Sequence, residues 1–317
     1  MFFTTNQPSP ESVNPEAIRV LNEFVTGQQN AVLVPKLSDI DRATGHAASE
    51  LWNLIPSEVR RFVARQMLEQ AESNLELNFS RMFSIALEDP DAEVRTSAIQ
   101  GLWEAPSSEL LHRLIRLLET ETEPLVREAI AEALGAYSYL ASLEELGDDD
   151  ADRVRDVLLV LFQSEEPIAV RKRALESLAY FPDDLEVEDA IDEAFSSQYH
   201  DLRVGAIFAM GRNVSDRWFS VLLGEMQDED AEVRFEATRA IGMFGDERAV
   251  SLLIDMVDDE DREVQLAAIG ALGAIGGTVA VGTLRRILRS EDTVINDAAQ
   301  EALTEATIAT DPLRFDR

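Results

Sequence analysis

The chain has 317 residues, no cysteine and a formal net charge of -33. The lack of cysteine excludes disulfides, thiolate metal sites and cysteine nucleophiles. The 61 acidic residues, set against 28 basic ones, would repel phosphate backbones, so the composition disfavours nucleic-acid binding.

The N-terminal part of the sequence predicts a loose segment followed by capping helices. Residues 1–13 are polar and contain two prolines, which predicts a flexible arm. The run Asn14-Pro-Glu predicts the start of a helix that ends near Val25, because proline is tolerated in a first helical turn. We expect Ser38 to cap a second helix that runs to Ile55.

No targeting or membrane segment is predicted. The N-terminus lacks a basic region, and the sequence has no apolar run of the ~18 residues that a membrane-spanning helix needs. We therefore expect a cytoplasmic protein.

A short pattern, Val-Arg-x-x-Ala-x-x-Ala-Leu-Gly with close variants, recurs from residue 94 to the C-terminus. Its arginine position recurs at intervals of 32, 44, 32, 31, 31 and 31 residues. The residues at this position are Arg95, Arg127, Arg171, Arg203, Arg234, Gln265 and Asn296. A period in this range indicates stacked copies of one supersecondary unit.

Each repeat predicts two helices. In residues 246–276, apolar positions from Val250 to Val257 share one helical face, and a second apolar face runs from Val264 to Leu272. The acidic run 258–261 separates the two faces and suits the start of the second helix. We expect the repeat arginine to bond to an acidic turn or a carbonyl of an adjacent repeat. A role for this arginine in ligand binding is the alternative.

This pattern resembles HEAT repeats, in the short version known from the phycobilisome-lyase-like group. The residues that carry the resemblance are Asp91-Ala-Glu-Val-Arg95, Asp230-Ala-Glu-Val-Arg234 with Ala237, Ala240 and Gly242, and Asp261-Arg-Glu-Val264 with Ala268, Ala271, Leu272 and Gly273. The resemblance implies an all-α, right-handed solenoid, an ARM/HEAT-like superhelix of about eight helix pairs. It also implies a possible accessory role in attaching or detaching a bilin, or in handling another protein-bound cofactor, together with a partner subunit.

The predicted organisation follows from the repeat register. Residues 14–80 are interpreted as N-terminal capping helices with a degenerate repeat that begins at Pro56-Ser-Glu-Val-Arg60. Residues 81–306 form the HEAT-like repeats, and residues 307–317 form a C-terminal tail. The long interval of 44 residues indicates an insertion near 137–150, which we expect to be a surface loop. Two explanations of the insertion remain open: a functional loop near a binding face, and neutral drift of a surface loop.

The sequence shows no catalytic constellation, and we assign no catalytic residue, metal ligand or cofactor. His46, His112 and His200 are scattered. The acidic runs 147–152 and 258–261 lack the spacing and terminal glutamate of an EF-hand, and solvated helix caps explain them better.

The polarity of one predicted surface changes along the repeats. The second helix of each pair tends to line the concave side, and the positions one, two and five residues after the repeat arginine should face outward there. These positions are polar in the early repeats and become apolar in the later ones. The candidate partner-binding residues are Val204, Phe208, Arg212, Phe235, Arg239 and Leu266. Burial of these side chains between twisted repeats is the alternative.

These observations predict a non-catalytic scaffold or adaptor that binds another protein in its concave groove. A basic or amphipathic segment would suit the acidic surface, whereas nucleic acid and membrane are not expected as partners. The acidity has a second explanation, because lysine-poor and acid-rich surfaces also occur in salt-adapted proteins. The alternative function is a bilin lyase-type or other cofactor-attachment accessory. The sequence predicts no oligomeric state.

Overall fold

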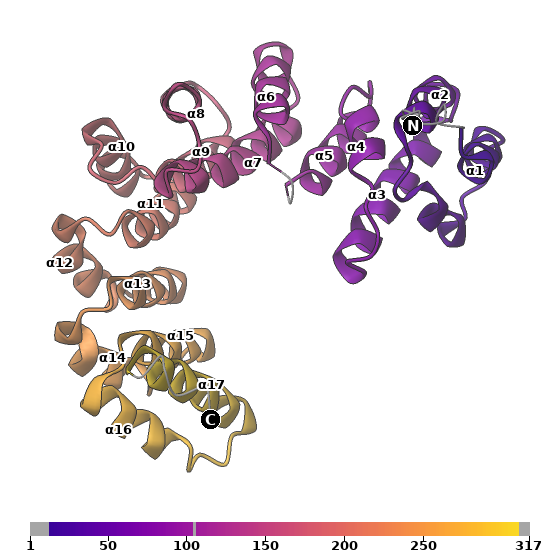
Figure 1. Cartoon of the computed structure of the whole chain (residues 1–317). Coiled ribbons are helices and arrows are strands. Elements are labelled where there is room, and N and C mark those ends of the chain that lie inside the picture. Colours follow the sequence, from indigo (N-terminus) through magenta and orange to yellow (C-terminus); the bar gives the residue numbers. More distant parts are fainter. Residues whose placement is uncertain (1–12, 104–105, 311–317) are drawn as a thin grey trace, which may run out of the picture. The chain divides into compact units, whose positions relative to one another are not determined.

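The structure, a computed structural model, describes residues 13–103 and 106–310 (Figure 1). Within these residues the regular elements are all helices. None of the described helices is long and apolar enough to cross a membrane. The predicted arm, residues 1–13, lies outside the described residues except for Val13.

The helices form pairs that repeat along the chain. The segment before the first pair consists of α1 (Pro15–Val25) and the 3₁₀ helix η1 (Ala31–Leu37). The first helices of the pairs are α2 (Arg42–Trp52), α4 (Ser80–Ala86), α6 (Ser108–Thr120), α8 (Asp148–Gln163), α10 (Leu185–Phe195), α12 (Asp216–Glu225), α14 (Val250–Met256, preceded by η2, Glu247–Ala249) and α16 (Gly277–Ile287). The second helices are α3 (Ser57–Ser73), α5 (Ala92–Gly101), α7 (Pro124–Ser142), α9 (Ile168–Leu178), α11 (His200–Asn213), α13 (Ala231–Phe244), α15 (Arg262–Ile275) and α17 (Thr293–Thr310). The described residues therefore contain eight helix pairs, which confirms the all-α solenoid expected from the repeat.

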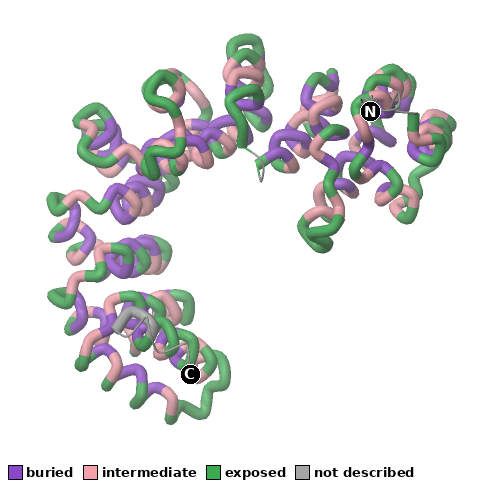
Figure 2. Tube along the Cα trace, in the orientation of Figure 1, coloured by how far each residue is buried: buried purple, intermediate pink, exposed green. Residues whose placement is uncertain are grey.

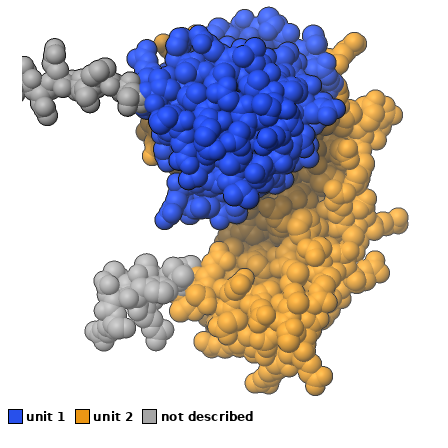
Figure 3. Space-filling view, turned by 90° about the vertical axis from the view of Figure 1, so that its right-hand side faces the viewer, with its two compact units in different colours: residues 1–137 blue, residues 138–317 orange. Residues whose placement is uncertain are grey.

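The chain divides into two compact units, residues 1–137 (unit 1) and 138–317 (unit 2) (Figure 3). In unit 2 each second helix packs on the second helix of the next pair, in the order α9, α11, α13, α15 and α17. These helices lie on the inner side of the curve of unit 2, and the first helices form its outer layer (Figure 1). Figure 2 shows buried residues where the helices of the two layers meet. The core of unit 2 is therefore continuous along this row of helices, as expected when each repeat contacts its neighbours.

Local signals explain where the first helices begin. The Asn14 side chain accepts hydrogen bonds from the backbone N–H groups of Glu16 and Ala17, which confirms the predicted start of α1. The prediction for Ser38 was wrong, because the segment before it forms η1 and Ser38 lies at the C-terminal end of that helix. The N-cap of α2 is Asp41, whose carboxylate accepts from the Thr44 N–H at 2.7 Å.

The predicted surface loop near residues 137–150 is also corrected. The additional residues extend α7 to 19 residues and α8 to 16, and only residues 143–147 connect the two helices. Tyr137 and Ser138 are buried and continue the packed face of α7, whereas residues 139–150 are half-buried or exposed. The segment therefore lies on the surface as expected, but outside residues 143–147 it is helical rather than a loop. Three aspartates, Asp148–Asp150, lie in the first turn of α8, where the helix dipole favours negative charge.

Candidate functional site

The repeat arginines hold successive repeats together. Arg234 donates to both carboxylate oxygens of Asp259, in the turn of the next pair, at 2.9 Å each. It also donates to the Asp228 carbonyl, in the turn of its own pair, at 2.9 Å. Arg95 makes the equivalent bonds to Glu121 and to the Asp89 carbonyl. These contacts confirm the structural role predicted for the repeat arginine.

The two later substitutions at this position keep one part of the contact. Gln265 donates to the Asp259 carbonyl at 2.6 Å, and Asn296 donates to the Leu288 carbonyl at 2.6 Å. Each amide therefore still satisfies a carbonyl in the turn of its own pair. The hydrogen bonds from Arg234 lower the pKa of Asp259, so this carboxylate stays ionised and paired.

The predicted strip lies on three consecutive second helices of unit 2. Val204 is buried, at 5% exposure, while Phe208, Phe235 and Leu266 are half-buried. The structure therefore places Val204 in the core rather than on the surface. The other three apolar side chains keep part of their surface accessible, on α11, α13 and α15 respectively.

The two arginines predicted beside the strip each lie over an aromatic ring. The Arg239 guanidinium is 5.5 Å from the centre of the Phe235 ring, and that of Arg212 is 5.6 Å from the centre of the Phe208 ring. Such contacts are electrostatically favourable, and they hold each guanidinium against the apolar surface. The structure thus brings each arginine together with one aromatic residue of the strip.

A buried carboxylate lies next to these residues. Glu236 is 8% exposed, and its Oε2 accepts from Arg239 at 3.1 Å. Burial raises the pKa of Glu236, while the charge of Arg239 and of Lys172 on α9 opposes that rise and Glu176 adds to it. Gly205 of α11 lies against the Lys172 stem, so this glycine leaves room for the lysine between α9 and α13.

We expect Glu236→Gln to stabilise unit 2 at neutral pH. Because the pKa of Glu236 is raised by folding, the protonated carboxyl is favoured in the folded state. This group therefore stabilises the fold fully below the pKa of an unfolded glutamate, ~4.3, and that stabilisation is lost as the pH rises through the folded pKa. Glutamine cannot ionise, so the gain over wild type should shrink to nothing in acid. Thermal melts across pH measure this difference. Glu260→Gln, at a side chain 88% exposed, is the control without pH-dependent gain. A less stable Glu236→Gln at neutral pH would show that the Arg239 pair outweighs burial.

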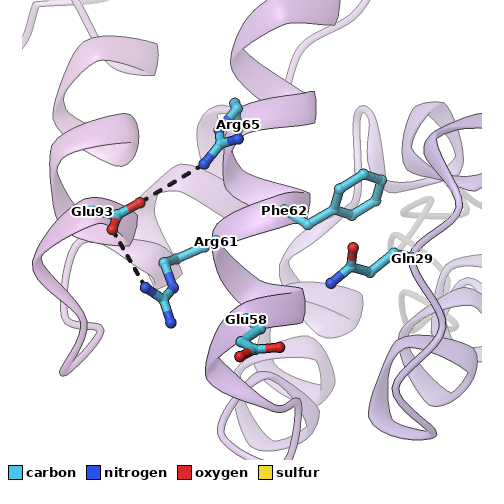
Figure 4. A pocket seen from close by; sticks show the side chains of 6 residues that line it. All are labelled: Gln29, Glu58, Arg61, Phe62, Arg65 and Glu93. Carbon is cyan, nitrogen blue, oxygen red and sulfur yellow. Dashed lines mark hydrogen bonds and ion pairs between the residues drawn. The ribbon is translucent and has the colours of Figure 1, made fainter.

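A second candidate surface lies in unit 1 and was missed at the sequence level. A cleft of about 310 Å³ is lined by Gln29, Glu58, Arg61, Phe62, Arg65 and Glu93 (Figure 4). In Figure 4 the side chains of Phe62 and Gln29 point toward each other, and Arg61 and Arg65 reach toward Glu93. The Nη–Oε distances of these two ion pairs are 3.4 and 3.8 Å.

The cleft follows the same positional rule as the strip. Arg61, Phe62 and Arg65 stand one, two and five residues after Arg60, which bonds to Asp89 of the next pair as the repeat arginines do. Counting the rule from Arg60 instead of Arg95 would have predicted them. The described residues contain no group of three or more His, Asp or Glu side chains that could hold a metal ion.

The comparisons with known proteins agree with this architecture. The family model for HEAT repeats matches residues 80–161, 187–262 and 219–304. Yeast importin-β is similar in structure, with a TM-score of 0.54 and 13% identity over 92% of this chain and 46% of its own. The Kap95:Nup1 complex gives a TM-score of 0.53, with 13% identity over 93% and 47% of the two chains. This chain thus spans about half the length of these importin chains.

The complex of CpcE and CpcF of phycocyanin lyase from Nostoc sp. matches with a TM-score of 0.49 and 19% identity, over 73% of this chain and 88% of that one. Comparison with curated proteins gives no match. The similarities to solved structures concern the fold. Because the family model covers more than half of the residues, the chain belongs to the HEAT-repeat family.

Proposed function

We propose that this HEAT-repeat protein is a non-catalytic scaffold that binds a segment of another protein along the second helices of unit 2. The binding surface comprises Phe208, Arg212, Phe235, Arg239 and Leu266. The observation that carries the proposal is that three large apolar side chains on consecutive helices remain only half-buried. Partly exposed apolar strips on soluble proteins usually mark binding sites.

The spacing of these side chains suits an elongated partner. Neighbouring packed helices lie about 8–10 Å apart, so Phe208, Phe235 and Leu266 span two such steps. A helix or an extended segment with apolar residues at matching intervals would contact all three. Arg212 and Arg239 border the strip and would fix the orientation of the segment through its polar groups.

We expect Phe235→Asp to abolish capture of the partner while unit 2 stays folded. The ring is only half-buried, so a carboxylate at this position remains hydrated but cannot bind an apolar side chain. Pull-down by the purified full chain, with mass spectrometry, would be compared between wild type and variant, and a thermal melt would report stability. Arg239→Gln removes the charge but keeps an N–H donor beside the buried Glu236, so it should weaken capture with a smaller loss of stability than Arg239→Glu, which places a second carboxylate next to Glu236.

Val160→Asp is the matched control. Val160 is 62% exposed on α8, a first helix of the outer layer, so capture should be unchanged. If Phe235→Asp instead lowers stability by several kcal/mol, the ring serves packing between repeats and the proposal fails. Unchanged stability with unchanged capture would also contradict it.

The bilin-handling role implied by the sequence resemblance stays an alternative. It predicts that the purified protein, incubated with a bilin, alters the absorbance spectrum of the pigment. A scaffold that binds only a protein segment leaves that spectrum unchanged. The same Phe235→Asp variant connects the two tests, because loss of a spectral change in this variant would place the pigment on the strip.

A further inference from the structure

Arg212, in the last turn of α11, is a cation without a counter-ion in a strongly acidic protein. It makes no ion pair with any described residue, and its buried Nε atom has no hydrogen-bond partner. Its neighbours on the adjacent helices differ, because Arg173 pairs with Glu176 at 2.8 Å and Arg239 pairs with Glu236 at 3.1 Å. Exposed arginines such as Arg285 and Arg286 also make no ion pair within the described part of the chain, but Arg212 combines this lack with a buried Nε that donates no hydrogen bond, and such a group needs an explanation.

Aromatic rings hold this guanidinium in place. Its central carbon lies 5.7 Å from the centre of the Tyr180 ring and 5.6 Å from that of Phe208. Tyr139, 50% exposed, packs its ring edge-on against Tyr180 with the ring centres 5.6 Å apart. The rings stabilise the positive charge by stacking on the faces of the planar guanidinium. They do not accept the hydrogen bonds that its N–H groups can donate within that plane.

The Nε atom is buried, but Arg212 as a whole is only half-buried, so its terminal amino groups are the donors that a partner can reach, and their chemistry points to a carboxylate. A guanidinium is a planar fork of N–H donors that matches the two oxygens of a carboxylate, and its aromatic contacts reduce the freedom lost on binding. A run of acidic residues or a nucleic acid would be repelled by the net charge of -33. A partner segment with a single carboxylate between apolar residues avoids most of that repulsion. Its apolar residues can then contact the ring of Phe208, which lies beside Arg212.

We propose that Arg212 is the carboxylate-recognition residue of the binding surface. It binds one Asp or Glu side chain of the partner segment, whose apolar residues lie on Phe208, Phe235 and Leu266. This inference rests on the proposed function and adds the chemical identity of the bound segment. Specificity then comes from Arg212 and affinity from the apolar strip.

Selection from a library of random peptides, displayed with their carboxyl ends joined to the carrier, tests the inference on the full chain. Only side-chain carboxylates are then available. Wild type should enrich peptides that carry one Asp or Glu beside apolar residues, and Arg212→Gln should enrich apolar peptides without that preference. Arg212→Lys keeps the charge but not the planar fork, so its preference should be intermediate. Melting curves establish that each variant is folded.

A double-mutant cycle then measures the contact itself. Replacing the acidic residue of a selected peptide by its amide should weaken binding to wild type about tenfold or more and leave binding to Arg212→Gln unchanged. Equal weakening for both proteins, or enrichment of peptides without an acidic residue, overturns the inference while the proposed function stands. If folded wild type enriches no peptide at all, the proposed function fails together with the inference.

Discussion

Asp89→Ala should destabilise unit 1 by about 4 kcal/mol, within the ~3–5 kcal/mol found when one partner of a buried ion pair is removed. The Asp89 side chain is fully buried, and it accepts from Arg60 Nε at 2.7 Å and from Trp52 Nε1 at 2.6 Å. It also accepts from the Asp91 backbone N–H, at the N-cap of α5. Its removal leaves the Arg60 charge, only 9% exposed, without a carboxylate.

The measurement is urea unfolding followed by circular dichroism, with hydrogen exchange of α3 and α5 to assign the lost stability to unit 1. Glu88→Ala is the matched control, because Glu88 is the preceding residue and its ion pair with Arg113 is on the surface, with Glu88 82% exposed. That change should stay within about 0.5 kcal/mol of wild type. A comparable loss from both variants would contradict the role assigned to Asp89.

The contact between Arg60 and Asp89 shows which parts of the fold can be predicted from the sequence. The spacing of the repeat arginines predicts helix pairs and a contact between each arginine and an acidic turn, because both recur with the period. The energetic contribution of an individual contact does not follow the repeat period. Asp89 occupies the same place as Asp228 and Asp259, yet Trp52 from another pair makes it the centre of a buried network.

The candidate site shows a second limit. The rule that selects Phe208, Phe235 and Leu266 depends only on the register of one helix. The same rule also selects Val204, which is buried, so the register names candidates but does not decide their exposure. The surroundings of Arg212 depend instead on Tyr180, which belongs to the preceding pair and follows the end of α9. Likewise, the length of the insertion after Tyr137 is visible in the interval, whereas its helical conformation depends on packing against neighbouring helices.

Gly211→Val should destabilise unit 2 by about 3 kcal/mol, at the upper end of the ~1–3 kcal/mol expected for overpacking. Gly211 of α11 faces Ala240 of α13, and a Cβ at Gly211 would lie 2.7 Å from the Ala240 Cα. That neighbour is backbone, so the two helices would have to move apart. Gly242 with Ala271, and Gly273 with Ala302, repeat the contact along the row. The recurring glycine is therefore required by helix approach rather than by a turn.

Gly270→Val provides the comparison, because Gly270 lies within α15 and a Cβ at this position would have no neighbouring atom within 4 Å. Valine is a better helix former than glycine, so this variant should be as stable as wild type or slightly more stable. Thermal unfolding of the two variants measures the difference. A Gly211→Val protein as stable as Gly270→Val would mean that α11 and α13 separate at little cost. In that case the inner row of unit 2 is held by the contacts of Arg203 and Arg234 with the next turns, rather than by the close approach of its helices.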